Sequence, residues 1–375
     1  MRVSSGRAGL LLALLTVLLP AHAEAQITWR DFVVTGGISA EGYQGNLPTA
    51  GATVRDSTEA ASAMVSEMGA RGGWIWRHDG IVRATLDFDG GVRQFTARGF
   101  ELRDYAPREW VGTLDLTAFQ PVTQGVLLTG FARVRGRQVE DRPPMPLFLP
   151  PAYRSAQGGL GVEVDAGGSS RVNVRVVGER SDFAAPEFAP QVRLLDRSSG
   201  TARLSATVPA GTSGALELFM GGELSRYPEQ TTFVDEDPFR RDRGWNAGAE
   251  WTHQGLRVAQ LGAELRTNRS NSRRPEYNSV TVQTLFSSPV PGDAIFSAYA
   301  ALTLKQYLEA IPSARLIPGE EANNASLAYL SLTRGLARNL DGTVRLGWTR
   351  AETEIGGEYF QRVGAYLLLR YRPGF

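Results

Sequence analysis

The chain has 375 residues, of which 42% are hydrophobic and 21% charged, with 40 basic and 39 acidic residues and no cysteine. This near-neutral balance gives no support for nucleic-acid binding, which depends on a basic surface. The absence of cysteine excludes disulfides, a lipid-modified cysteine and thiolate metal sites, so the fold must be held together in another way.

The N-terminal segment has the form of an export signal. Arg2 and Arg7 precede an apolar run over residues 8–20, and residues 21–23 and 23–25 have the small-x-small form of a signal-peptidase site. This pattern predicts a signal peptide over residues 1–23, with cleavage after residue 25 as the alternative. The apolar run is short for a membrane helix, and residues 24–375 form one predicted domain.

The rest of the sequence consists of segments in which apolar and polar residues alternate. In residues 126–135, for example, Val126, Leu128 and Val134 alternate with Arg133 and Arg135. Successive side chains of a strand point to opposite faces, so each segment predicts a strand with one apolar face and one solvated polar face. Sixteen strands are predicted, or fourteen or eighteen if one hairpin is miscounted: 27–41, 64–77, 81–97, 109–120, 126–138, 153–165, 170–181, 199–208, 214–226, 244–253, 256–267, 276–287, 294–307, 324–335, 343–354 and 358–373.

Short and long connections alternate along the chain. Gly, Pro, Asn and Asp mark seven short turns, as at 166–169 and 337–342, and longer polar links such as 139–152 and 182–198 lie between them. Short turns at one end and longer loops at the other are typical of a single antiparallel up-and-down transmembrane β-barrel.

The last strand carries the most specific signal. Val363, Leu367, Leu369, Tyr371 and Phe375 share one face, and the other face carries Arg362, Arg370 and Arg372. An amphipathic last strand that ends on an aromatic residue resembles the closing strand of bacterial outer-membrane β-barrels, although Pro373-Gly374 departs from the usual ending.

The resemblance implies a porin-like plan in the outer membrane of a Gram-negative bacterium. The short turns would face the periplasm and the long links the exterior. Leu369, Tyr371 and Phe375 would form the insertion signal read by the barrel-assembly machinery, and membrane lipid would surround the barrel. No subfamily motif is recognised.

The competing all-β interpretation is an exported soluble sandwich or propeller. Against it, the predicted strands exceed the usual ~5–6 residues of globular sheets. Aromatic residues also gather near strand ends, as interface girdles require; they are Trp74, Trp76, Trp110, Trp245, Trp251, Tyr359 and Tyr371.

Many charged residues share a face that must point away from lipid, where each arginine would cost ~2–4 kcal/mol near the midplane. The predicted lumen-lining residues are Arg83, Asp87, Asp115, Arg133, Arg135, Arg171, Arg175, Glu217, Glu250, Glu264, Arg345 and Arg370. Such a lumen would either hold a water column or be cross-braced by ion pairs and closed. The stripe of Arg133, Arg135 and Arg137 favours a weak preference for anions.

Two long links carry unusual residues. The link 139–152 contains five prolines, and its apolar Met145, Leu147 and Phe148 are predicted to fold into the pore as a constriction; a partner contact or capping of the mouth are the alternatives. Residues 56–63 have the composition of a short helix behind Asp56.

Four arginines in the long links are the predicted contacts for lipopolysaccharide phosphate, with ordinary solvated loop charge as the alternative. They are Arg240, Arg241, Arg273 and Arg274.

The sequence offers no credible catalytic centre or cofactor motif. His78 and His253 are the histidines of the mature chain and fall in predicted turns, away from the outer rim. Residues 235–237 are three consecutive acids that rarely converge on one ion, and Gly158, Gly159 and Gly161 lie inside a strand pattern.

A passive channel for small hydrophilic solutes is therefore the first hypothesis, and a non-conducting barrel whose loops bind lipopolysaccharide, a partner protein or a surface polymer is the second.

Overall fold

The computed structural model describes residues 26–45, 61–78, 81–98, 106–140, 152–185, 190–232, 238–272, 276–308, 326–352 and 359–374. Within these ranges it contains a 3-10 helix η1 (Pro190–Leu195) and sixteen strands. The strands are β1 (Gln26–Gly45), β2 (Ala61–His78), β3 (Ile81–Arg98), β4 (Arg108–Thr123), β5 (Val126–Glu140), β6 (Tyr153–Gly167), β7 (Ser170–Phe183), β8 (Arg197–Pro209), β9 (Gly214–Thr231), β10 (Phe239–Gln254), β11 (Val258–Ser270), β12 (Tyr277–Val290), β13 (Ala294–Tyr307), β14 (Ser326–Ala337), β15 (Leu340–Glu352) and β16 (Tyr359–Tyr371). The described residues include no helix with the length and apolar character needed to cross a membrane.

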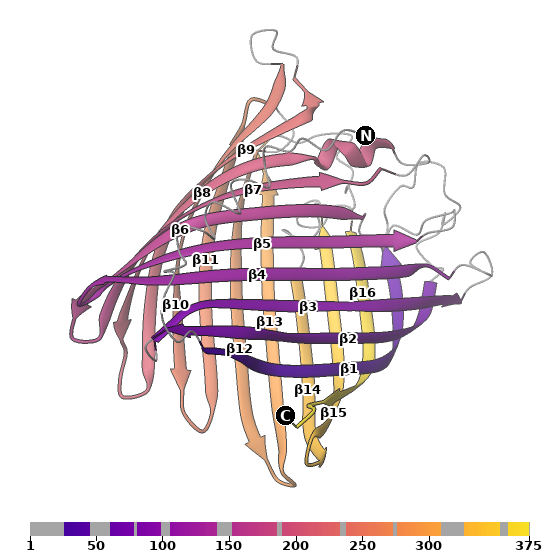
Figure 1. Ribbon diagram of the computed structural model, residues 1–375. Coiled ribbons are helices and arrows are strands. Elements are labelled where there is room, and N and C mark those ends of the chain that lie inside the picture. The colour runs from indigo at the N-terminus through magenta and orange to yellow at the C-terminus, as the bar shows by residue number, and fades with distance from the viewer. Residues whose placement is uncertain are drawn as a thin grey trace.

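The strands form one closed antiparallel barrel, which confirms the predicted fold class and the strand count of sixteen. Each strand pairs with its neighbours in sequence, and β1 pairs with β16 from Val34 opposite Tyr371 to Gly45 opposite Phe360. Closure pairs the first strand with the last, as a sheet surrounded by lipid requires. In Figure 1 the near strands β1 to β6 cross the far strands β11 to β16 steeply, as the tilt of barrel strands demands.

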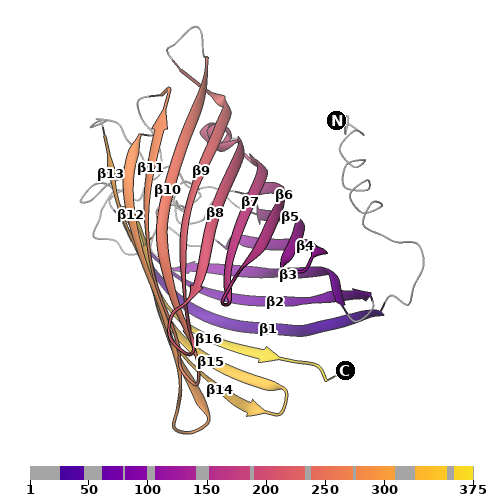
Figure 2. The ribbon, with the colours of Figure 1, turned by 90° about the vertical axis from the view of Figure 1, so that its left-hand side faces the viewer.

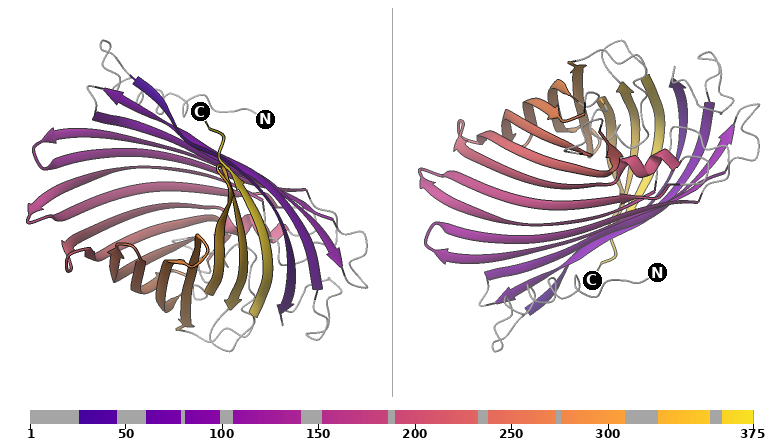
Figure 3. Two further views of the ribbon diagram at one scale, coloured as in Figure 1. Left: turned by 90° about the horizontal axis from the view of Figure 1, so that it is seen from below. Right: turned by 90° about the horizontal axis from the view of Figure 1, so that it is seen from above.

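The two ends of the barrel differ. The short hairpin turns lie along the left and lower edge of Figure 1, and we call this the turn end; the opposite end, where β5 ends at Glu140, is the link end. Figure 2 shows β8 to β13 rising together from the turn end to the link end. Seen from below and from above in Figure 3, the colours run round one continuous curved sheet until β16 lies beside β1.

Turn residues at the turn end adopt backbone angles that favour glycine. Gly125 has a φ of 84°, and Gly292 and Asp293 have φ values of 84° and 55°. Two consecutive left-handed residues match the type I′ turn that suits the twist of a two-stranded ribbon. These angles explain why the turn signals in the sequence located the hairpins correctly.

Alternation divides the strands into an apolar outer face and a polar inner face. Leu218 and Met220 on β9 are 51% and 55% exposed, whereas Glu217 and Phe219, which alternate with them, lie on the other face. Hydrogen bonds that reach over a strand, such as Gln283 Nε2 on β12 to Glu250 Oε2 on β10 at 2.8 Å, mark the concave inner side. The exposed apolar face is therefore the outside of the barrel, which only lipid would cover.

Aromatic side chains flank the outer apolar band at both ends. Trp110 and Trp245 lie toward the link end and are 45% and 65% exposed. Trp29 and Trp251, 59% and 39% exposed, lie toward the turn end together with Trp74, whose ring centroid is 4.6 Å from that of Trp29. Two bands of aromatic side chains, one at each end of the apolar band, match the aromatic girdles at the interfaces of membrane barrels.

Several local predictions differ from the structure, and β9 ends at Thr231, five residues after its predicted end. Helix η1 lies inside a link that was predicted to be irregular; Val192 and Leu195 are buried, 3% and 5% exposed. Strand β10 begins at Phe239, five residues before its predicted start. Its first residues carry charge on both faces, so they show no alternation of apolar and polar residues from which a strand could be predicted. Residues 61–63 belong to β2 and not to a helix, because they pair with residues 41–43 of β1, and residues 56–60 lie outside the described ranges.

Candidate functional site in the barrel interior

The strand registers place the predicted lumen residues on inward-facing positions, except Arg83, which lies at the register shift between β2 and β3 and is not paired in either register. Asp115 lies opposite Arg133, Glu217 opposite Glu250, and Arg345 opposite Tyr366. The full set is Arg83, Asp87, Asp115, Arg133, Arg135, Arg171, Arg175, Glu217, Glu250, Glu264, Arg345 and Arg370. Their position follows from the fold, and their role in passing solutes stays a prediction.

Most interior charges have partners on the same wall. Arg203 Nη2 lies 2.9 Å from Glu217 Oε1, and Arg171 lies 3.6 Å from Glu163 and 3.5 Å from Asp165. Other contacts of the predicted set include Arg133 with Asp115, Arg30 with Asp87 at 3.6 Å, Asn246 with Glu264 at 3.2 Å, and Gln283 with Glu250 at 2.8 Å. Each of these pairs joins strands that are neighbours or next-but-one, so the charges brace the wall along its circumference.

Two inward arginines lie directly opposite each other on β7 and β8. Arg175 faces Arg203 in the register, and their guanidinium carbons lie 3.7 Å from the centroid of Phe131 and 3.9 Å from that of Phe219. Stacking on an aromatic face favours a cation and holds the guanidinium plane against the wall. Arg203 is paired with Glu217, whereas Arg175 has no ion pair among the described residues, so Arg175 contributes the excess positive charge in the middle of the wall.

Glycine makes room for the ring beneath Arg175. A Cβ atom on Gly159 would lie 2.7 Å from the Phe131 ring. Only a residue without a side chain allows the ring to lie flat on β6, which explains why this glycine interrupts the strand pattern.

A second group of charges, the seam cluster, joins the first and last strands. Glu41 on β1 is 2% exposed and accepts hydrogen bonds from Ser39 and Tyr43. Its carboxylate also lies 2.9 Å from Arg93 Nη2 on β3 and 3.7 Å from Arg362 Nη1 on β16. A buried carboxylate needs such partners, and here they span the strands on both sides of the closure.

The seam cluster extends to β4 and β5. Arg93 also lies 3.4 Å from Glu67 and 3.5 Å from Glu109, and Arg137 Nη2 lies 2.6 Å from the other Glu109 oxygen. These alternating charges link six strands near the link end, so this part of the wall is held as one unit.

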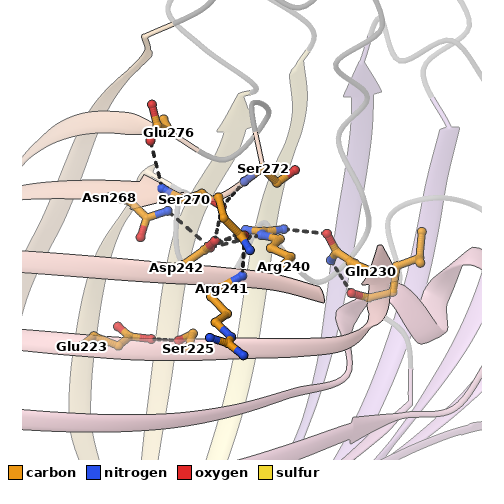
Figure 4. Close-up of polar contacts among 12 residues, drawn as sticks. Glu223, Ser225, Gln230, Arg240, Arg241, Asp242, Asn268, Ser270, Ser272 and Glu276 are labelled. Atoms are coloured by element: carbon orange, nitrogen blue, oxygen red, sulfur yellow. Dashed lines mark hydrogen bonds and ion pairs between the residues drawn. The ribbon is translucent and has the colours of Figure 1, made fainter. Parts of the chain in front are cut away.

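A third group lies at the link end of β9 to β11 (Figure 4). Arg240 contacts Asp242 through two nitrogens, at 2.6 and 3.0 Å, and donates to Gln230 at 2.9 Å. Gln230 in turn donates to the carbonyl of Leu194 in η1, and Ser270 donates to Asp242 at 2.6 Å. This network ties η1 to the barrel wall.

Burial corrects one predicted lipopolysaccharide contact. Arg240 is 7% exposed and faces inward, because its partner Asp242 lies on the same inner side of β10. Arg241 lies on the outer face, and Arg273 and Arg274 are outside the described residues.

Some of the remaining predicted site residues lie within the described ranges and others lie outside them. Leu369 and Tyr371 point outward and are 44% and 48% exposed, while Phe375 lies outside the described residues. The predicted constriction residues Met145, Leu147 and Phe148, residues 235–237 and the predicted signal peptide also lie outside those ranges.

Both histidines lie at or near the ends of strands and do not lie within turns as predicted. His78 is the last residue of β2, and His253 is on β10 with its ring 6.1 Å from that of Trp251. Within the described ranges no group of three or more His, Asp or Glu side chains is arranged to hold a metal ion.

Comparison with known proteins gives distant similarity of fold alone. No protein-family model matches the sequence, and no curated protein is similar to it in sequence. Among solved structures, a BenF-like porin from Pseudomonas fluorescens Pf-5 shares 10% identity with a TM-score of 0.45, over 93% of this chain and 98% of that one. OccK5 (OpdH) of Pseudomonas aeruginosa shares 8% identity with a TM-score of 0.44, over 92% and 99% of the two chains. A bacterial polysaccharide outer membrane secretin shares 8% identity with a TM-score of 0.38, over 90% and 98%.

These similarities are too distant to assign a role to any residue. The class of protein follows from the chain itself: a closed sixteen-strand barrel with short turns at one end, long links at the other, an apolar outer band and a charged interior. It is a β-barrel of the outer-membrane type, porin-like in plan.

Proposed function

We propose that this protein is an outer-membrane channel for passive diffusion of small hydrophilic solutes, with a preference for anions. The observation that carries the proposal is the direction of the interior ion pairs. Each joins two strands that are neighbours or next-but-one, as Arg203–Glu217 and Arg93–Glu41 do. These ion pairs therefore do not cross the lumen from one wall to the opposite wall.

Barrel size and solvent access support the same function. Barrels of about 16 strands are wide enough to enclose an aqueous channel. The interior side chains of Arg171 and Asp165 are 61% and 60% exposed although they contact each other, so water reaches them. Charged groups that remain hydrated on the wall suit the passage of polar solutes.

The preference for anions rests on the mid-wall arginines. Arg175 and Arg203 lie directly opposite each other, and Arg135 adds an exposed guanidinium on β5. Because the walls of the lumen have a low dielectric constant, a local excess of one sign of charge raises the concentration of counter-ions beside it.

Proteoliposome swelling tests the proposal. Full-length protein should admit a small neutral sugar and a small carboxylate faster than protein-free liposomes, and R175Q/R203Q should slow the carboxylate about tenfold relative to the sugar. The outward-facing pair R154Q/R180Q is the matched control and should leave both rates unchanged. Swelling no faster than in protein-free liposomes would favour the non-conducting barrel.

A further inference from the structure

The closing pair β1–β16 differs from the other neighbouring pairs of the described strands, because its two strands are not consecutive in the chain. A short turn or a link joins the strands of each other pair, and the connection helps to fix the register of a hairpin. The register of the closing pair, with Ala40 opposite Ala365, must therefore be set by the side chains that meet there.

Alternation of apolar and polar residues does not set this register on its own. The outward residues of the pair are Val34, Gly36, Ile38, Ala40 and Gly42 on β1, and Val363, Ala365, Leu367, Leu369 and Tyr371 on β16. A slip of one residue would turn the apolar face of β16 inward, but a slip of two residues would leave all these residues outward. Contacts between particular side chains must exclude the two-residue slips.

The seam cluster opposes a slip toward the link end. Arg362 Nη1 lies 3.7 Å from Glu41 Oε2, and Arg362 is directly opposite Tyr43, whose hydroxyl donates to the same carboxylate. Moving β16 by two residues toward the link end would place Arg362 opposite Gly45 and away from Glu41. The carboxylate, which is 2% exposed, would then lose one of its two arginines while still buried.

A match of side-chain size opposes slips in both directions. Leu368 lies directly opposite Gly37, and a Cβ atom on that glycine would lie 2.5 Å from Leu368 Cδ2. In the two slipped registers Leu368 would instead lie opposite Ser39 or Thr35, whose side chains occupy the space that a glycine leaves empty. The observed register is the one that places the Leu368 side chain against a residue without a side chain.

We infer that the seam cluster and the contact between Leu368 and Gly37 together fix the register in which the barrel closes. The charges oppose one slip, and the packing opposes both. A hydrogen bond from Gln361 Nε2 to Gln44 Oε1, 2.7 Å long and directly across the pair, supports the same register at its link end. Specifying register is the best-attested role of buried polar and charged groups.

Disulfide cross-linking tests the register directly, because the chain contains no cysteine of its own. Residues directly opposite each other are close enough for a disulfide, whereas diagonal neighbours lie ~7–8 Å apart. The pair A40C/A365C reports the observed register, and A40C/L367C and A40C/V363C report the two slipped registers. With no other substitution, copper-phenanthroline oxidation of the full-length protein in detergent should cross-link the first pair at least about tenfold more than either of the others.

R362Q/L368A should raise the cross-linking of at least one slipped pair about tenfold, because it removes both the ion pair to Glu41 and the side chain that needs the glycine. R171Q/L285A is the matched control, since it makes the same two changes at inward positions of β7 and β12, away from the seam. It should leave all three yields within about twofold of those without it. Heat-dependent gel mobility establishes that each variant is folded, and R362Q alone gives the test if the double variant is not.

Three results would overturn the inference. Cross-linking of a slipped pair as strong as that of A40C/A365C, with no other substitution, would show that the register is not fixed. Slipped-pair yields that stay unchanged in folded R362Q/L368A, or that rise equally in R171Q/L285A, would show that these contacts do not fix it. Cross-linking requires no conduction, so its outcome is independent of the channel proposal.

Discussion

Glu41 is the residue on which the charge pairing of the seam cluster depends most. Its carboxylate is enclosed and has partners on β1, β3 and β16. Glu67 contacts the same arginine, Arg93, but retains 31% of its side-chain exposure. The two glutamates therefore share chemistry and a partner and differ in burial, which makes them a matched pair.

Glu41→Gln should lower the free energy of unfolding by about 3–5 kcal/mol, because two arginines lose a buried counter-charge. Glu67→Gln should cost under about 1 kcal/mol, since water partly screens that pair. Equilibrium urea unfolding of the barrel in lipid vesicles measures both. Equal losses for the two variants would show that the seam does not depend on the buried carboxylate.

Gly159 tests the packing beneath the mid-wall arginines. Gly159→Ala should destabilise the barrel by about 1–3 kcal/mol, because the new methyl group would clash with the carbonyl oxygen of Val176 and with the Phe131 ring on which Arg175 stacks. Gly178→Ala, on the outer face with nothing within 4 Å of the new Cβ, should be neutral or slightly stabilising. The same unfolding assay compares them, and a Gly159→Ala variant as stable as wild type would contradict this packing.

At the scale of elements, the alternation of outer and inner residues can be tested on β9. Leu218 points outward between the levels of Trp251 and Trp245, opposite Ala249, and Thr207 on the neighbouring β8 points inward opposite Glu217. Leu218→Arg should cost about 2–4 kcal/mol because a guanidinium would enter the apolar band. Thr207→Arg should fold with a loss under about 1 kcal/mol beside the Glu217 carboxylate. Vesicle-refolding yields and urea unfolding measure the difference, and the reverse order of stability would mean that the faces are exchanged.

Strand positions were largely predictable from the sequence because period-two alternation persists in most strands and turn residues interrupt it. The signal failed where both faces carry charge. Residues 239–243 are dominated by charge, so the start of β10 was placed at residue 244. Helix η1 was missed because a segment of six residues is too short to show a helical period, even with apolar Val192, Leu194 and Leu195.

The inward charges were predicted well on regular strands, whereas Glu41 was missed as a member of the site. The reason is a register shift between Arg30 and Val33, which reverses the alternation within β1. Ile27 and Trp29 point outward, as do Ile38 and Ala40. Strict counting in twos across the shift would place Glu41 on the wrong face, and only the paired structure reveals it.

Across the whole molecule, closure, an outer apolar band and a braced but hydrated inner wall support the proposal that the barrel conducts. The central claim is that ion pairs reinforce the wall without filling the lumen. Stepwise current and the sign of selectivity both depend on that arrangement, and neither depends on knowing which solute crosses.

Single-channel recording of purified full-length protein in a planar bilayer tests this claim most directly. The structure predicts discrete current steps and, under a salt gradient, a reversal potential of the sign expected for a channel that prefers anions, reduced in R175Q/R203Q. A folded barrel that inserts into the bilayer without any current steps would contradict the open lumen, and a reversal potential of the opposite sign would contradict the role of the mid-wall arginines.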